Sequence, residues 1–195
     1  MAHVFNPGGR SRLDAPERDE WQQPDRLLDA LGIGTGMSIA DIGTGTGYFA
    51  IRLAALVGEA GRIYAVDVQH KMLDTLLERA AAGPGHNIIP VYSNGVQIPL
   101  PGAEVDLVFS ANVAHEFDRL SDVMSECARI LRPQGRGVIV DWKPEATPVG
   151  PPEDHRLPPE KVLEAARQAG LKPGPAPGIA HDLLPYQYIL ALFLD

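Results

Sequence analysis

The sequence has little cysteine, no long apolar run and no basic run, and each shortage excludes a class of protein. Its 195 residues include a single cysteine, Cys127, so no internal disulfide can form and a reducing, cytoplasmic compartment is expected. No stretch approaches the roughly eighteen consecutive apolar residues of a membrane span. Residues 1–10 lack the apolar segment of a signal peptide. The formal net charge of −8 argues against nucleic acid as a partner.

The order of apolar patterns predicts one α/β domain. Hydrophobic residues make up 45% and charged residues 22% of the chain, as in ordinary globular proteins. Strands are expected at 37–42, 62–67, 87–92, 105–110, 137–141 and 186–194, and helices at 24–31, 48–57, 71–81, 119–131 and 160–169. Alternating strands and helices form right-handed βαβ units. The predicted fold is therefore doubly wound, with a mostly parallel sheet between two helical layers.

A glycine-rich turn joins the first predicted strand to the helix at 48–57. It reads D-I-G-T-G-T-G at residues 41–47, and glycines let the backbone turn sharply and approach a ligand closely. Asp67 lies twenty residues beyond Gly47, at the end of the second strand. A carboxylate there can accept hydrogen bonds from both hydroxyls of a ribose. The turn and Asp67 together predict a nucleoside-containing ligand at the carboxyl edge of the sheet.

Gly45, Gly47 and Ala50 also fit the dinucleotide pattern G-x-G-x-x-A. An NAD(P)-binding oxidoreductase is therefore an alternative function, although the sequence has no Tyr-x-x-x-Lys constellation to serve it. The spacings H-x-x-x-H and C-x-x-C are also absent, so no metal site is predicted.

These motifs resemble those of the class I S-adenosylmethionine (SAM)-dependent methyltransferases, especially the small bacterial, ubiquinone/menaquinone-biosynthesis-like (type 11) branch. Residues 41–47 are similar to that family's D/E-x-G-x-G-x-G loop, and residues 65–68 to the acidic end of its second strand. Residues 93–100, 105–109 and 131–136 resemble its G-D-A-x-x-L-P-F segment, its fourth strand and its L-K-P-G-G turn. The resemblance implies a Rossmann-like three-layer sandwich, a seven-stranded sheet with an antiparallel C-terminal strand, and methyl transfer from SAM to a small-molecule acceptor.

The resemblance also implies which residues hold SAM. They are Asp41, Gly43, Thr44, Gly45, Gly47, Asp67, Val68, Asn94, Gly95 and Asn112. Asn94 departs from the family pattern, which has an adenine-contacting Asp there; an amide can both accept and donate a hydrogen bond. Residues 24–195 are expected to form the single SAM-binding domain. Residues 1–23 are expected to form a lid, because the family's short members carry a variable N-terminal segment.

Three residues are candidates for contact with the methyl acceptor. His115 follows the fourth strand at the same edge of the sheet, and histidine is the usual base at neutral pH; it can equally cap or pack a helix start. Trp142 and His155 are candidates for lining the acceptor pocket, with core packing the alternative for Trp142. A soft nucleophile would need no base. A protein that binds SAM without catalysing methyl transfer is a further alternative function. The sequence identifies neither the acceptor nor the oligomeric state.

Overall fold

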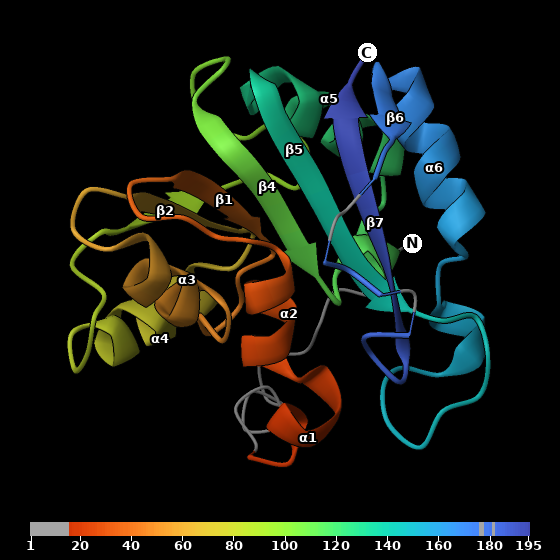
Figure 1. Cartoon of the computed structure of the whole chain (residues 1–195), viewed down its shortest axis with the longest axis horizontal. Helices are drawn as coiled ribbons and strands as arrows, with labels where there is room; N and C mark the ends of the chain where they lie inside the picture. Colours follow the sequence, from red (N-terminus) through yellow and green to blue (C-terminus); the bar gives the residue numbers. More distant parts are fainter. Residues whose placement is uncertain (1–15, 176–177, 181) are drawn as a thin grey trace.

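Strands and helices alternate along the chain in the computed structural model, which describes residues 16–175, 178–180 and 182–195 (Figure 1). The helices are α1 (Arg18–Gln22), α2 (Pro24–Ala30), α3 (Ala50–Val57), α4 (His70–Ala80), α5 (Leu120–Ile130) and α6 (Pro159–Gln168), with 3-10 turns η2 (Ala114–Glu116) and η3 (Glu153–His155). The strands are β1 (Ser38–Ile42), β2 (Arg62–Asp67), β3 (Ile88–Tyr92), β4 (Val105–Ala111), β5 (Leu131–Trp142), β6 (Leu171–Pro173) and β7 (Gln187–Leu194). No helix in these ranges is long and apolar enough to cross a membrane.

The seven strands form one sheet in the order β3-β2-β1-β4-β5-β7-β6. Strands β1 to β5 pair in parallel, and β7 runs antiparallel to both of its neighbours. The predicted mostly parallel, seven-stranded sheet with an antiparallel C-terminal strand is therefore confirmed. The chain winds outward from β1 to β3 and then returns to β4, so the order reverses between β1 and β4. Ligands bind at such a reversal point in open α/β sheets.

Two apolar cores lie on the two faces of this sheet. Helices α2, α3 and α4 contribute to one core, and α5 and α6 to the other; Figure 1 shows α2 and α3 in front of the sheet and α5 behind it. Strand β1 is buried along its whole length, with Ile39 in the first core and Ala40 and Ile42 in the second. Burial on both faces explains why the strand sequences are continuous apolar runs.

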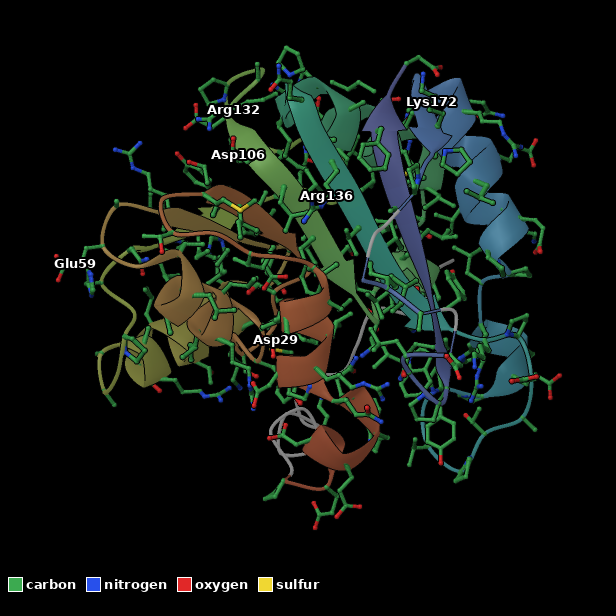
Figure 2. All side chains as sticks on the ribbon, in the orientation of Figure 1. Asp29, Glu59, Asp106, Arg132, Arg136 and Lys172 are labelled. Carbon is green, nitrogen blue, oxygen red and sulfur yellow. The ribbon has the colours of Figure 1, made fainter. Side chains whose placement is uncertain are left out.

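Asp106 ties three segments together at the amino edge of the sheet, opposite the predicted ligand site. Its carboxylate accepts a hydrogen bond from the backbone N–H of Ser38 at 2.8 Å and from Arg132 Nη1 at 2.7 Å (Figure 2). One side chain thus connects β4 with the start of β1 and with the turn inside β5.

The structure differs from the predicted elements at two places. The short edge strand β6 is not among the predicted strands; three residues are too few to show a period, and an edge strand tolerates Pro173. Strand β5 begins at Leu131, because Leu131 pairs with Val105 before the register shifts to Leu107 and Arg136. The predicted turn around Gly135 is therefore an irregularity within the strand.

The first prediction concerns Gly47, whose φ is +84°. A Cβ at this position would lie 2.8 Å from Leu76 Cδ1 in α4. Gly47→Ala should therefore lower the free energy of unfolding by about 1–3 kcal/mol, measured by urea denaturation. Gly170→Ala is the matched control, because Gly170 also has a positive φ, +75°, and nothing lies within 4 Å of its added Cβ. An equal loss in both variants would mean that the contact with Leu76 is not the cause.

Candidate cofactor and acceptor site

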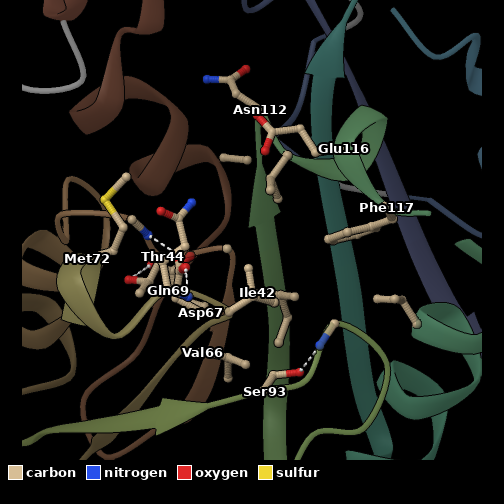
Figure 3. Close-up of a pocket in the computed structure, with 18 of the residues that line it drawn as sticks. Ile42, Thr44, Val66, Asp67, Gln69, Met72, Ser93, Asn112, Glu116 and Phe117 are labelled. Carbon is tan, nitrogen blue, oxygen red and sulfur yellow. Dashed lines mark hydrogen bonds between the residues drawn. The ribbon is translucent and has the colours of Figure 1, made fainter. Parts of the chain in front are cut away.

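A cavity of about 430 Å³ lies at the carboxyl ends of β1, β2 and β4 (Figure 3). It is lined by the turn after β1, the end of β2, the segment after β3 and the segment after β4, together with one residue of α1. This is the point where the strand order reverses. The doubly wound topology therefore places the cavity where the sequence predicted a ligand.

Backbone hydrogen bonds hold the glycine turn against β2. The N–H groups of Gly43 and Thr44 both donate to the carbonyl oxygen of Val66, at 2.8 and 3.0 Å. Gly43 has a φ of +73°, and a Cβ there would lie 2.6 Å from a Val113 side-chain carbon. Only glycine fits this position, because a side chain would meet Val113 and strain the backbone.

Asp67 completes the connection between the turn and β2. Its carboxylate accepts hydrogen bonds from the backbone N–H groups of Gly45 and Gln69, each at 2.9 Å and each to a different oxygen. The residue is 8% exposed, and burial raises its pKa while these hydrogen bonds oppose the rise. A carboxylate oxygen can accept more than one hydrogen bond, so Asp67 retains capacity for the hydroxyls of a ligand.

Asp41 is a second buried carboxylate beneath the same turn. It is 3% exposed and accepts a hydrogen bond from Thr44 Oγ1 at 2.8 Å. Burial raises the pKa of Asp41 to about 7, with a smaller contribution from the charge of Asp67, against the opposing effects of Thr44 and Arg18. The floor of the cavity therefore holds an acid that changes charge near neutral pH.

Arg18 brings a positive charge from α1 into the cavity lining. It is 8% exposed, and its guanidinium carbon lies 3.7 Å from the centroid of the Tyr48 ring. Helix α1 is also held by Asp19, which accepts a hydrogen bond from the Tyr48 hydroxyl and forms an ion pair with Arg52 at 3.0 Å. Residues 16–23 of the predicted lid are described, and Arg18, Asp19 and Gln22 contact Tyr48, Arg52 and Asn112; residues 1–15 lie outside the described residues.

Asn94 lines the opposite end of the cavity. Its Oδ1 accepts hydrogen bonds from the backbone N–H groups of Val96 at 3.1 Å and Gln97 at 2.8 Å. Both lone pairs of the amide oxygen are therefore used, and the amide NH₂ is the group left to face a ligand.

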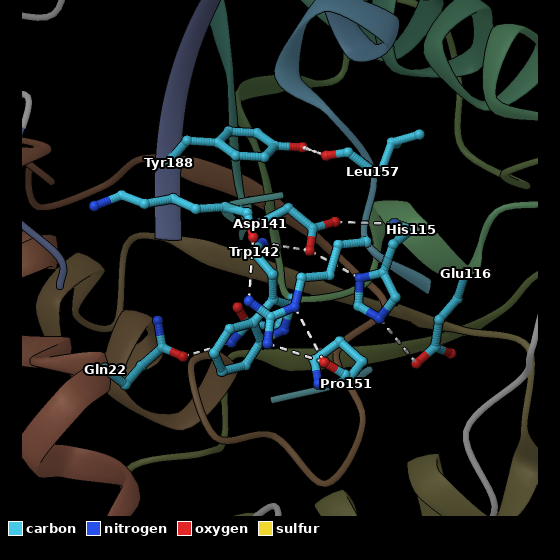
Figure 4. A network of polar contacts seen from close by, with 11 residues as sticks. Gln22, His115, Glu116, Asp141, Trp142, Pro151, Leu157 and Tyr188 are labelled. Atoms are coloured by element: carbon cyan, nitrogen blue, oxygen red, sulfur yellow. Dashed lines mark hydrogen bonds and ion pairs between the residues drawn. The ribbon is translucent and has the colours of Figure 1, made fainter. Parts of the chain in front are cut away.

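Three titratable side chains lie in a row where the segment after β4 meets the end of β5: Asp141, His115 and Glu116 (Figure 4). Asp141, at the end of β5, is 0% exposed and accepts hydrogen bonds from the backbone N–H groups of His115 at 2.9 Å and Trp142 at 2.8 Å. Its Oδ1 also lies 2.8 Å from His115 Nδ1. On the other side of the ring, His115 Nε2 lies 3.9 Å from a carboxylate oxygen of Glu116.

Burial lowers the pKa of His115, but the hydrogen bond to Asp141 and the negative charges of Asp141 and Glu116 outweigh it. Arg156 opposes them, and the net pKa is raised above the ordinary 6.5. The surroundings of His115 therefore favour the imidazolium form.

The structure brings together all but one of the residues predicted to hold SAM. Those that line the cavity are Asp41, Gly43, Thr44, Gly45, Asp67, Val68, Asn94, Gly95 and Asn112. Gly47 instead faces Leu76 of α4. Within the described ranges, no three His, Cys, Asp or Glu residues are arranged to hold a metal ion.

The three residues predicted to contact the acceptor do not line this cavity. His115 lies behind Glu116, bound to Asp141. Trp142 is 4% exposed and packs against Trp21 of α1, with ring centroids 5.1 Å apart. His155 is exposed on η3.

The sequence interpretation missed Arg18 and Glu116, both of which line the cavity. Arg18 lies in a short segment without apolar periodicity, so nothing in the sequence indicated which way it points. Glu116 follows His115 directly, and only the conformation of η2 shows which of the two faces the cavity.

Comparison with known proteins assigns the class. Residues 39–135 match the methyltransferase domain family. A SAM-dependent methyltransferase from Aquifex aeolicus of known structure is 30% identical, with a TM-score of 0.91, and the match covers 98% of this chain and 100% of that protein. The chain therefore belongs to the SAM-dependent methyltransferases.

More distant relatives differ in the acceptors that their names state. The ubiquinone/menaquinone biosynthesis C-methyltransferase of Azotobacter vinelandii is 29% identical over 119 residues, which is 59% of this chain and 46% of the relative. The 27-O-demethylrifamycin SV methyltransferase of Amycolatopsis mediterranei is 26% identical over 178 residues, which is 83% of this chain and 63% of the relative. The chain spans about half the length of the first of these relatives.

The second prediction follows from Asp41, whose folded-state pKa of about 7 exceeds the ordinary 3.8. Because the native state holds a proton that the unfolded chain releases, the free energy of unfolding should fall as pH rises from about 4 to about 7. Asp41→Asn keeps an acceptor for Thr44 and should remove the contribution of Asp41 to this fall in the free energy of unfolding. That contribution is about 1.4 kcal/mol for each unit by which the pKa of Asp41 is raised. Urea denaturation of the ligand-free protein at several pH values measures it.

Asp29→Asn, on the exposed surface of α2, is the control and should leave the decline unchanged. Parallel stability curves for Asp41→Asn and the unmutated protein would show that Asp41 does not carry a raised pKa.

Proposed function

We propose that this protein binds SAM in the cavity described above and transfers the methyl group to a small-molecule acceptor. The observation that carries the proposal is the Asp67 carboxylate, fixed at the cavity by the N–H of Gly45 at the end of the parallel sheet. Bound SAM supplies an electrophilic methyl carbon on a positively charged sulfur. The chain's own residues then have to bind the cofactor, orient the acceptor and exclude water.

The charges of the cavity fit SAM, which carries a sulfonium, an ammonium and a carboxylate. The lining contains four acidic side chains, Asp41, Asp67, Glu116 and Asp118, against the basic side chains Arg18 and Arg119. Among the described residues, the buried Oδ1 of Asn112 also accepts no hydrogen bond. An excess of carboxylates and a buried acceptor suit a ligand that is net positive and carries N–H donors.

Each end of the cofactor has a candidate partner. Asp67 suits the ribose hydroxyls, because its oxygens accept hydrogen bonds at the rim of the cavity. Val68, Asn94 and Gly95 suit the adenine, with the Asn94 NH₂ as donor. Arg18 suits the carboxylate of the methionine portion, because its guanidinium lines the cavity close enough to Asp41 to lower that residue's pKa.

We propose residues 24–195 as a single methyltransferase domain, with α1 as part of a cover over the cofactor. The support for the cover is local: Asp19, Arg18 and Gln22 of α1 contact Tyr48, Arg52 and Asn112 around the cavity. Trp21 of the same helix also packs against Trp142, with the two rings tilted by 42°.

The direct test is binding followed by turnover. Calorimetry should show micromolar binding of S-adenosylhomocysteine and no binding of NAD. Formation of S-adenosylhomocysteine from SAM in the presence of an acceptor then distinguishes an enzyme from a protein that only binds SAM. Binding of NAD without SAM would instead support the oxidoreductase alternative.

The third prediction separates the two ends of the cofactor with two ligands. S-adenosylhomocysteine carries the amino-acid carboxylate, and 5′-methylthioadenosine lacks it. Arg18→Gln should weaken S-adenosylhomocysteine by about 10- to 100-fold, the usual value of a charged hydrogen bond, and leave 5′-methylthioadenosine unchanged in calorimetry. Arg26→Gln, on the exposed face of α2, is the control. Equal weakening of both ligands would assign Arg18 to the packing of α1 instead.

The fourth prediction concerns the ribose. Asp67→Ala should cost about 2–4 kcal/mol of affinity for both ligands, because both carry the two hydroxyls and the carboxylate forms charge-assisted hydrogen bonds. Asp29→Asn again serves as the control. Unchanged affinity for either ligand in Asp67→Ala would place the ribose elsewhere.

A further inference from the structure

The turn after β4 presents acidic side chains to the cavity. Glu116, Phe117 and Asp118 all line it, and His115 does not; Figure 3 shows Glu116 and Phe117 among the lining side chains. The group that a bound acceptor meets on this side is therefore a carboxylate rather than an imidazole.

Burial decreases in order from Asp141 through His115 to Glu116. The side chains of these three residues are 0%, 9% and 19% exposed. Asp141 is fixed by three N–H donors, two of them from the backbone. His115 is fixed in turn, because Asp141 Oδ1 accepts a hydrogen bond from its Nδ1 at 2.8 Å. The imidazole thus stands at a set position beside the Glu116 carboxylate (Figure 4).

In this arrangement the His115 ring is not available to take a proton from the acceptor. A carboxylate only accepts hydrogen bonds, so Nδ1 carries a proton, and the second carboxylate, 3.9 Å from Nε2, favours a proton there as well. An imidazolium has no lone pair to accept a proton from an acceptor. The same positive charge favours Glu116 as an anion.

We propose that the methyl acceptor is a small neutral amine, that its N–H donates to Glu116, and that His115 and Asp141 are positioning residues that hold the Glu116 carboxylate in place. The proposal rests on the proposed function, because it assumes methyl transfer in this cavity. It extends that function by naming the acceptor class.

The chemistry of an amine acceptor does not require a base to remove a proton during methyl transfer. The nitrogen lone pair forms the bond to the methyl carbon, the carbon–sulfur bond breaks with its electron pair left on sulfur, and the positive charge moves from sulfur to nitrogen. No proton has to move during this step. A fixed carboxylate beside the nitrogen stabilises the charge that develops there.

Acceptors that react as anions match the site poorly. A phenolate, an enolate carbon or a thiolate would approach Glu116 and Asp118, and like charges repel in a partly buried site. An alcohol has to lose its proton as it reacts; His115 does not line the cavity, and a carboxylate such as that of Glu116 is a weak base for an alcohol, because the ordinary pKa of glutamate is about 4.3. The acidic lining therefore favours nitrogen over oxygen, sulfur and carbon.

The first experiment is an acceptor panel with the full chain and SAM, measured as S-adenosylhomocysteine formed. Aniline and N-methylaniline, whose nitrogens are unprotonated at about pH 7, should be methylated, and phenol, benzyl alcohol and thiophenol should not. Glu116→Gln should lower kcat/KM for the amines by roughly 10²-fold, with S-adenosylhomocysteine affinity in calorimetry within about twofold of the unmutated protein. The matched control is Glu59→Gln, whose side chain is exposed away from the cavity (Figure 2); it should behave as the unmutated protein.

The second experiment needs no acceptor. Nitrogen-15 NMR titration of the histidine rings should give His115 a pKa above the ordinary 6.5, with His115→Asn identifying its signals. Glu116→Gln should lower the pKa of His115, and Asp141→Asn should lower it further, because each variant removes one facing negative charge and leaves Arg156 in place. If Asp141→Asn does not fold, the Glu116→Gln titration alone decides this point.

Four results would overturn the proposal: methylation of phenol or thiophenol but of neither amine, S-adenosylhomocysteine binding with no turnover of either amine, Glu116→Gln with unchanged kcat/KM, or a His115 pKa that is not raised above 6.5. Failure of the unmutated protein to bind S-adenosylhomocysteine at all would instead contradict the proposed function. The two failures are therefore distinguishable.

Discussion

The hydrogen bond from the backbone N–H of Gly45 to the Asp67 carboxylate connects the two strand ends on which the site is built. Strands β1 and β2 pair in parallel, so their carboxyl ends lie side by side. The 2.9 Å contact between Gly45 and Asp67 closes the gap between the turn and the second strand. Gly43, which has a positive φ, also brings the same turn close to Val113 in the segment after β4. Three strand ends thus surround one cavity.

Electrostatics give the cavity its chemical character. Asp41, Asp67 and Asp141 are buried at the carboxyl edge, where each needs hydrogen bonds to offset the loss of water. Backbone N–H groups supply them for Asp67 and Asp141, and the Thr44 hydroxyl supplies one for Asp41. His115 supplies a further hydrogen bond to Asp141, and Arg18 lies close enough to Asp41 to lower its pKa, so positive groups offset part of the negative charge. Acidic side chains still outnumber basic ones in the cavity lining, which fits the cationic cofactor proposed above.

Helix α1 is a short element whose importance comes from its contacts. Its five residues bury Arg18 and Gln22, and its neighbours are Tyr48, Arg52 and Asn112, far away in the sequence. An isolated helix of this length would not be stable in water. Its order therefore depends on these contacts with residues distant in the sequence.

The sequence by itself determined strands β1 to β5 and β7 and the glycine turn with Asp67 at the neighbouring strand end, because these follow from apolar periodicity and residue spacing, which are local properties. Strand β6 and the start of β5 could not be predicted in this way, since a three-residue edge strand and a register shift depend on pairing with β7 and β4. Only the tertiary structure decided that Glu116 and not its neighbour His115 faces the cavity, because Asp141 lies 26 residues away from His115 and binds its ring. Likewise, only the tertiary structure shows that Arg18 lies at the site, where it contacts the ring of Tyr48, thirty residues further along the chain. Contacts between segments far apart in the chain leave no periodic pattern, so they appear only once the chain has folded.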